Sequence, residues 1–120
     1  MGARSMATIH GIKACDTMKK ACAWLDDHGI AHDFHDFKKV GVTRAMLERW
    51  CDAAGWEKVI NRAGTTFRKL PEDARADLDR DKAIALMLAQ PSMIKRPVLE
   101  SGDIVEIGFK PDRYQILFPG

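Results

Sequence analysis

The fold is decided by the apolar stretch Ala7-Thr8-Ile9-His10-Gly11-Ile12, which is followed by Lys13-Ala14-Cys15 and an amphipathic segment from Asp16. The first stretch is short, partly β-branched and interrupted by glycine, which is typical of a strand. After Asp16, apolar residues recur at spacings of three and four, and this pattern predicts a helix capped by Asp16 or Thr17. Cys15 therefore lies at a strand-to-helix turn.

This placement gives Cys15 a possible chemical role. The first turn of a helix has unpaired backbone N–H groups and a partial positive charge. Both stabilise a thiolate, which is the nucleophilic form of cysteine. Lys13, Lys19 and Lys20 add positive potential around the thiol. The alternative is that Cys15 fills the turn as a small buried hydrophobe, and the turn by itself leaves both interpretations open.

The remaining sequence predicts one α/β domain. After the first helix we expect a strand at 30–37, a helix from Thr43 to Gly55 and a helical turn at 56–60. An irregular basic loop at 61–69, a short helix at 71–76 and a helix at 81–89 opened by Asp79 follow. The chain then forms strands at 96–100 and 104–107 around Ser101-Gly102-Asp103, and a closing helix at 111–118. This βαβ, helices, ββα order implies a parallel first strand pair joined by a right-handed crossover. We expect a single domain at 7–118, preceded by a disordered terminus or expression remnant at 1–6.

Composition narrows the classes of function. The chain has 120 residues with 19 basic and 17 acidic side chains, a net charge of +2. This balance does not favour direct nucleic-acid binding. The longest apolar run, 83–89, is too short to cross a membrane, and no signal peptide is recognisable at the N-terminus. Three cysteines without framework or metal-ligand spacing indicate free thiols. We therefore expect a cytoplasmic monomer that holds no metal.

Three arginines are candidate anion ligands. Arg62 and Arg68 lie in the basic loop, and Arg96 directly precedes Pro97. The planar guanidinium fork donates paired hydrogen bonds to tetrahedral oxyanions. The alternative is that these arginines are solvated loop charges, as most arginines are. The Arg96–Pro97 bond can be cis or trans, and the sequence does not show which.

Three segments, in this order and spacing, resemble the ArsC family. They are Gly11-Ile12-Lys13-Ala14-Cys15-Asp16-Thr17-Met18-Lys19-Lys20, Arg62-Ala63-Gly64-Thr65-Thr66-Phe67-Arg68-Lys69-Leu70 and Ile94-Lys95-Arg96-Pro97-Val98-Leu99. Within the family the chain is most similar to the arsenate reductase-like YffB branch, and more distantly to the Spx regulators. The resemblance covers about 7–118. It implies a thioredoxin-like fold, with a mixed four-stranded sheet and a helical insertion.

The resemblance also implies roles for single residues. In arsenate reductases of this type a cysteine after the first strand attacks arsenate, and this position is Cys15 here. Arg68 and Arg96 correspond to oxyanion ligands. Pro97 corresponds to the cis-proline that faces the thiol in thioredoxin-like folds.

Two positions depart from the pattern of the relatives. Arsenate reductases have a further arginine before a proline near the last helix, where this chain has Lys110, which keeps the charge but not the fork. Spx has a Cys-x-x-Cys pair, and its second position is Met18 here. Arg62 and Lys13 complete the candidate ligands for an oxyanion or glutathione. Cys22 and Cys51 lie on apolar helix faces, and we expect both to be structural.

The resulting hypothesis is a glutathione-dependent thiol reductase of the arsenate reductase-like class. Cys15 would attack an oxyanion or a glutathione mixed disulfide, and glutathione, as co-substrate, would resolve the adduct. Glutaredoxin is a candidate protein partner. The alternatives are a non-enzymatic, Spx-like module that docks on RNA polymerase, and a glutathione-binding scaffold with weak chemistry.

Overall fold

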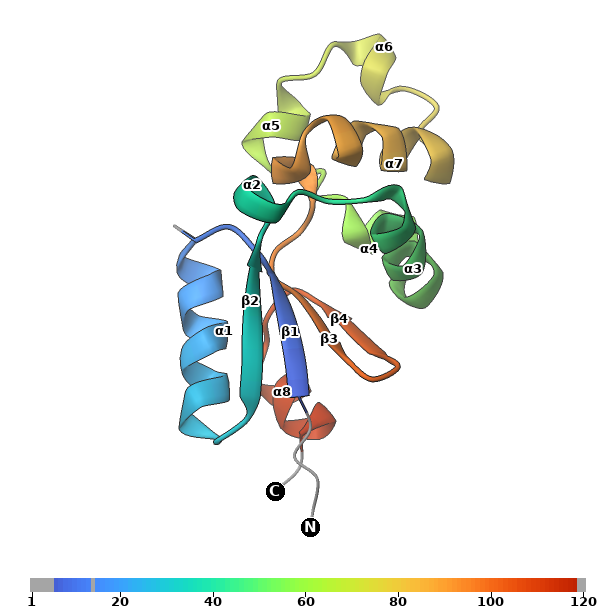
Figure 1. Cartoon of the computed structure of the whole chain (residues 1–120). Coiled ribbons are helices and arrows are strands. Elements are labelled where there is room, and N and C mark those ends of the chain that lie inside the picture. The colour runs from blue at the N-terminus through green and yellow to red at the C-terminus, as the bar shows by residue number, and fades with distance from the viewer. Residues whose placement is uncertain (1–5, 14, 119–120) are drawn as a thin grey trace. The chain divides into compact units, whose positions relative to one another are not determined.

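The chain forms two compact units. The computed structural model describes residues 6–13 and 15–118 (Figure 1). The first unit combines residues up to 39 with residues from 96 onward, and the second unit spans 40–95. Of the expected N-terminal segment, residues 1–5 lie outside the described residues, and Met6 already begins the first strand. No helix in the described ranges is long and apolar enough to span a lipid bilayer.

The first unit is built on a mixed four-stranded sheet. Its elements are β1 (Met6–Gly11), α1 (Asp16–Asp27), β2 (Ala31–Asp36), β3 (Val98–Ser101), β4 (Ile104–Ile107) and α8 (Pro111–Leu117). The strand order is β2-β1-β3-β4. Strands β1 and β2 are parallel, whereas β3 is antiparallel to both β1 and β4. The mixed sheet and the βαβ…ββα order predicted from the sequence are confirmed.

The core of this unit lies between α1, α8 and the sheet. Its buried residues are Ala7, Ile9, Met18, Ala21, Leu25, Leu99 and Tyr114. Ala7 and Ile9 alternate along β1, and the α1 residues share one helical face, so one side of each element is apolar. Gly11 allows a close approach at the end of β1, because a Cβ there would overlap the Met18 side chain. This contact fixes the first turn of α1 against the strand that leads to Cys15.

The start of α1 differs from the prediction. Neither Asp16 nor Thr17 is the N-cap, because Cys15 itself has an extended backbone (φ −104°, ψ 127°) and the helix begins at Asp16. Asp16 instead lies in the first turn, where a carboxylate interacts favourably with the helix dipole. The predicted stop at Gly29 is confirmed, and this residue has a positive φ of 66°.

The second unit is helical. Its elements are α3 (Arg44–Ala54), α4 (Trp56–Val59), α5 (Thr65–Arg68), α6 (Glu72–Arg75), α7 (Arg80–Ala89) and a 3₁₀ turn at Pro91–Met93. Both predicted caps are confirmed: the Thr43 hydroxyl accepts a hydrogen bond from the Met46 N–H at 3.2 Å, and Asp79 accepts one from the Lys82 N–H at 2.8 Å. The buried side chains of the unit include Leu47, Trp50, Val59, Ile60, Ile84, Met87 and Ile94.

Two short α-helices of the described residues, and the 3₁₀ turn at Pro91–Met93, were not predicted. The region 61–69, expected to be irregular, contains α5, whose Phe67 is buried and whose Thr66 receives a hydrogen bond from Ser92 at 3.2 Å. The second strand ends at Asp36, and Phe37–Val40 forms α2, with Phe37 buried. Single helical turns are marginal by themselves. The two α-helices form here because a tertiary core takes up one aromatic side chain of each.

Candidate active site around Cys15

Cys15 is the N-cap residue of α1 and is half-buried. Burial acts most strongly on its thiol and raises the pKa. The Met18 N–H, the Arg96 guanidinium and the Thr17 N–H act in the opposite direction, and together they outweigh burial. The net result is a Cys15 pKa below the ordinary value of a thiol. The helix start thus provides the thiolate stabilisation that the sequence predicted.

Strand pairing explains how Arg96 reaches Cys15. His10 of β1 pairs with Val98 of β3 in an antiparallel register, so the beginning of β3 lies beside the end of β1. Arg96 is half-buried just before β3 begins, and β1 ends toward Cys15 at the same end of this strand pair. The Arg96–Pro97 peptide bond is cis. The structure therefore brings Cys15 and Arg96 together.

The other candidate ligands lie on exposed positions. Lys13 is in the turn after β1, and Lys110 is the N-cap of α8. Arg68 is the last residue of α5, and the Arg62 guanidinium lies 5.9 Å from the centre of the Trp56 ring. Arg62 and Arg68 belong to the second unit, and their contribution to the site, like that of Lys110, stays a prediction.

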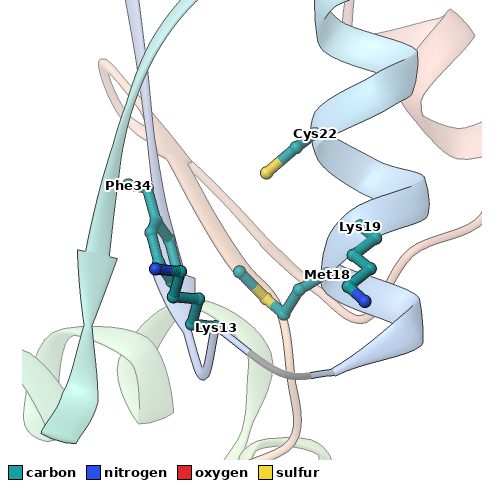
Figure 2. Close-up of a pocket in the computed structure, with 5 residues that line it drawn as sticks. All are labelled: Lys13, Met18, Lys19, Cys22 and Phe34. Carbon is teal, nitrogen blue, oxygen red and sulfur yellow. The ribbon is translucent and has the colours of Figure 1, made fainter.

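A pocket opens beside the first turns of α1. It has a volume of about 200 Å³ and is lined by Lys13, Met18, Lys19, Cys22 and Phe34 (Figure 2). Sequence reasoning did not name Phe34 as a site residue. The available signal was its place in an alternating strand, on a face that carries other partly exposed residues.

The three free cysteines differ in their electrostatic surroundings. Burial, helped by the Asp26 carboxylate, raises the pKa of Cys22. Burial also raises the pKa of Cys51, and the nearby Arg80 compensates only in part. Cys51 is buried in α3, as expected for a structural residue, whereas Cys22 is half-buried and faces the pocket.

A polar pair with a buried histidine lies near the end of β1. His10 is 3 % exposed, and its Nε2 is 2.7 Å from Glu100 Oε1 on β3. Its ring also packs edge-on against His35 of β2. His10 is thus a hydrogen-bonded core residue that connects neighbouring strands. Among the described residues, no group of three or more His, Cys, Asp or Glu side chains gathers in a way that could hold a metal ion.

The chain is similar in sequence and in fold to known proteins. The sequence profile of the ArsC family matches residues 10–117. A solved structure named YFFB (PA3664) protein is 64% identical, with a TM-score of 0.90, and the match covers 92% of this chain and 96% of that one. An arsenate reductase (ArsC) related protein from Brucella melitensis is 55% identical, with a TM-score of 0.78 and coverage of 100% and 99%.

A more distant relative is the global transcriptional regulator Spx of Streptococcus mutans. It is 27% identical over 95% of this chain and 84% of its own length. The fold is thioredoxin-like, with the mixed four-stranded sheet that the resemblance implies. The match of the family profile over nearly the whole chain means that this protein belongs to the ArsC family.

Proposed function

We propose that the protein is a thiol-dependent reductase of the arsenate reductase-like class, with Cys15 as nucleophile and glutathione as the resolving thiol. The observation that carries the proposal is the environment of Cys15. Two backbone N–H groups and the Arg96 guanidinium lower its pKa in spite of burial. The same groups that stabilise a thiolate also stabilise negative charge on a bound oxyanion.

With a glutathione mixed disulfide as substrate, the reaction is an exchange of sulfur bonds. The Cys15 thiolate attacks one sulfur, a new S–S bond forms, and the other sulfur leaves as a thiolate. The thiolate of free glutathione then attacks the adduct, releases Cys15 and forms the oxidised product. Arg96 stabilises Cys15 both as attacking and as leaving thiolate.

With arsenate as substrate, Cys15 displaces an oxygen of the oxyanion, which leaves as water, and an arsenic–sulfur bond forms. Attack of glutathione on the Cys15 sulfur breaks that bond and transfers two electrons to arsenic. Arsenite leaves, and Cys15 remains as a mixed disulfide with glutathione, which a second thiol from glutathione or glutaredoxin reduces. Support comes from the similarity to the arsenate reductase (ArsC) related protein of Brucella melitensis. Arg68 and Lys110 are the further oxyanion ligands in this proposal.

The test is a coupled assay in which glutathione disulfide production is followed with arsenate or a mixed disulfide as substrate. We expect turnover in the wild type and in Cys51→Ser, which alters a cysteine outside the pocket lining, and none in Cys15→Ser. Full activity of the Cys15→Ser variant would refute the mechanism. Turnover with the mixed disulfide alone would exclude arsenate as the substrate.

The similarity to Spx supports a second function, a regulator that binds RNA polymerase. Met18 stands where Spx carries its second cysteine, so a switch based on a local disulfide is not available to this chain. Retention of RNA polymerase by the immobilised protein, independent of Cys15, would favour the regulator. An enzyme without such a role should not retain the polymerase.

A further inference from the structure

The pocket beside the first turns of α1 is mainly apolar. Met18 is buried and Cys22 half-buried, and both project from α1, while Phe34 lies on β2 with 39% of its surface exposed. Figure 2 shows the Met18 and Cys22 side chains pointing from the helix toward the side on which Phe34 lies. The groups that line the pocket are therefore a thioether, a thiol, an aromatic ring and lysine side chains.

The size of the pocket matches a ring-sized group. A volume of about 200 Å³ exceeds that of an engineered apolar cavity of about 150 Å³ that takes up benzene. Apolar pockets with a few polar groups at fixed positions are typical of small-molecule sites. An aromatic or branched aliphatic substituent would cover Phe34 and remove apolar surface from water.

The charge of the pocket favours an anion. Lys13 and Lys19 both line it, one from the turn after β1 and one from the first turns of α1. No acidic side chain belongs to the lining among the described residues. Two ammonium groups next to an apolar wall fit a ring or branched chain that carries a carboxylate.

The pocket lies within reach of the reactive sulfur. Met18 and Lys19 follow Cys15 by three and four residues, which is one turn of α1, or a rise of about 5 Å. A substituent attached to a sulfur that is bound to Cys15 spans this distance with a few atoms. A group held in the pocket would therefore belong to the substrate of Cys15.

We propose that this pocket is the specificity site for disulfide substrates and binds the anionic, ring-sized substituent on the sulfur that Cys15 attacks. The inference rests on the proposed function. The Cys15 thiolate forms an S–S bond to the sulfur that carries this substituent, the original S–S bond breaks, and the other half of the disulfide leaves as a thiolate. The substituent stays in the pocket until glutathione attacks the adduct.

The test compares three disulfides in single-turnover reactions with the reduced protein. Dithiobis(nitrobenzoate) is aromatic and anionic, dithiodipyridine is aromatic and neutral, and hydroxyethyl disulfide is small and neutral. Rates are measured for each, and mass spectrometry assigns the adduct to Cys15. Because a change in the thiolate fraction affects all three reactions alike, the ratios between probes report on the pocket.

Matched variants separate the pocket from general effects. Lys19→Ala should lower the preference for the anionic over the neutral aromatic disulfide about threefold to tenfold. Lys20→Ala removes the same charge at the next helix position, outside the pocket lining, and should leave that ratio unchanged. Phe34→Ala should reduce the preference for aromatic over small disulfides about threefold or more. Ile116→Ala, at another exposed apolar position, should not.

The outcomes distinguish the inference from the function on which it rests. Equal ratios in Lys19→Ala and Lys20→Ala, together with no effect of Phe34→Ala on the aromatic preference, would overturn the specificity site while leaving Cys15 as nucleophile. Absence of a Cys15 adduct with all three probes would overturn the proposed function itself. Loss of the preference only in the two pocket variants would support the inference.

Discussion

Helix α1 carries one cysteine at its start and one in its second half, and the pKa values of the two thiols are shifted in opposite directions. Cys15, at its start, has a lowered pKa, and Cys22, further along the same helix, has a raised one. Burial raises the pKa at both positions. The difference comes from the groups around each sulfur: two N–H groups and Arg96 near Cys15, and the Asp26 carboxylate near Cys22.

The second half of α1 serves packing. Leu25 is fully buried, and Trp24 packs edge-on against Tyr114 of α8, with ring centres 5.5 Å apart. One helix thus positions a reactive group at its N-terminus while its buried face packs on the core from Met18 to Leu25. Changes to the groups around Cys15 should therefore affect reactivity, and truncation of a buried residue near the end of α1 should affect stability.

The largest expected effect is that of Cys15→Ser. The rate of thiol–disulfide exchange should fall at least about 10³-fold, because the attacking thiolate is gone. Cys22→Ser is the matched control on the same helix, and it should retain most of the rate with hydroxyethyl disulfide, which carries no group for the pocket that Cys22 lines. Single-turnover kinetics with hydroxyethyl disulfide measure both variants, and comparable losses in the two would remove the distinction between the two cysteines of α1.

Leu25→Ala tests how much packing in the second half of α1 contributes to stability. Truncation of this fully buried side chain should lower the free energy of unfolding by about 3 kcal/mol, measured by urea denaturation. The alkylation rate of Cys15 in the folded protein should change little. Ile116→Ala truncates a side chain with 65% exposure and should change stability by less than about 0.5 kcal/mol. A strong decrease in Cys15 reactivity of folded Leu25→Ala would show that the two halves are coupled.

Arg96→Gln tests how the Arg96 guanidinium affects the Cys15 pKa at the start of α1. Loss of the guanidinium should raise the Cys15 pKa and slow alkylation at pH 7 about tenfold. The alkylation rate follows the thiolate population, which decreases as the pH drops through the pKa. Because the variant has the higher pKa, its rate should decrease at a higher pH than that of the wild type. The pH dependence of Cys15 alkylation, followed by mass spectrometry, measures the shift.

Lys20→Gln is the control for Arg96→Gln, since it removes a positive charge that is not among the groups that shift the Cys15 pKa. Its pH profile should stay close to that of the wild type. Coincident profiles for Arg96→Gln and the wild type would remove Arg96 from the site. In that case the backbone N–H groups would be the remaining source of the lowered pKa.

The sequence allowed prediction of the parts that depend on local pattern. The alternation in β1 and β2, the spacing in α1, the turn at Gly102 and the placement of Cys15 before a helix all follow from neighbouring residues. The N-cap of α1 was missed because it depends on the backbone conformation of Cys15, which the capping preferences of Asp16 and Thr17 do not reveal. Helix α5 was missed because burial of Phe67 stabilises it rather than helix propensity.

In the site, too, features set by neighbouring residues could be predicted, and features set by tertiary contacts could not. Arg96 was a candidate by residue type and by family resemblance, but its effect on Cys15 depends on the pairing of β1 with β3, which joins distant parts of the sequence. The pocket depends on the side-by-side placement of α1 and β2. No local pattern marks Phe34 as opposite Met18 and Cys22, so the pocket became visible only in the folded chain.

The smallest expected effect is that of Tyr114→Phe, at the packing end of α1. Tyr114 is fully buried, and its hydroxyl has no hydrogen-bond partner among the residues that the structure describes. Burial, with a smaller effect of Glu106, raises its pKa far above the ordinary value, so the group stays neutral. Removal of an unpaired buried hydroxyl eliminates its desolvation cost and should change stability by less than about 1 kcal/mol, toward a more stable protein. Urea denaturation measures this change. A loss of stability larger than about 1 kcal/mol would show that the hydroxyl binds a buried water. A lower alkylation rate of Cys15 in the variant would show that packing at one end of α1 controls chemistry at the other.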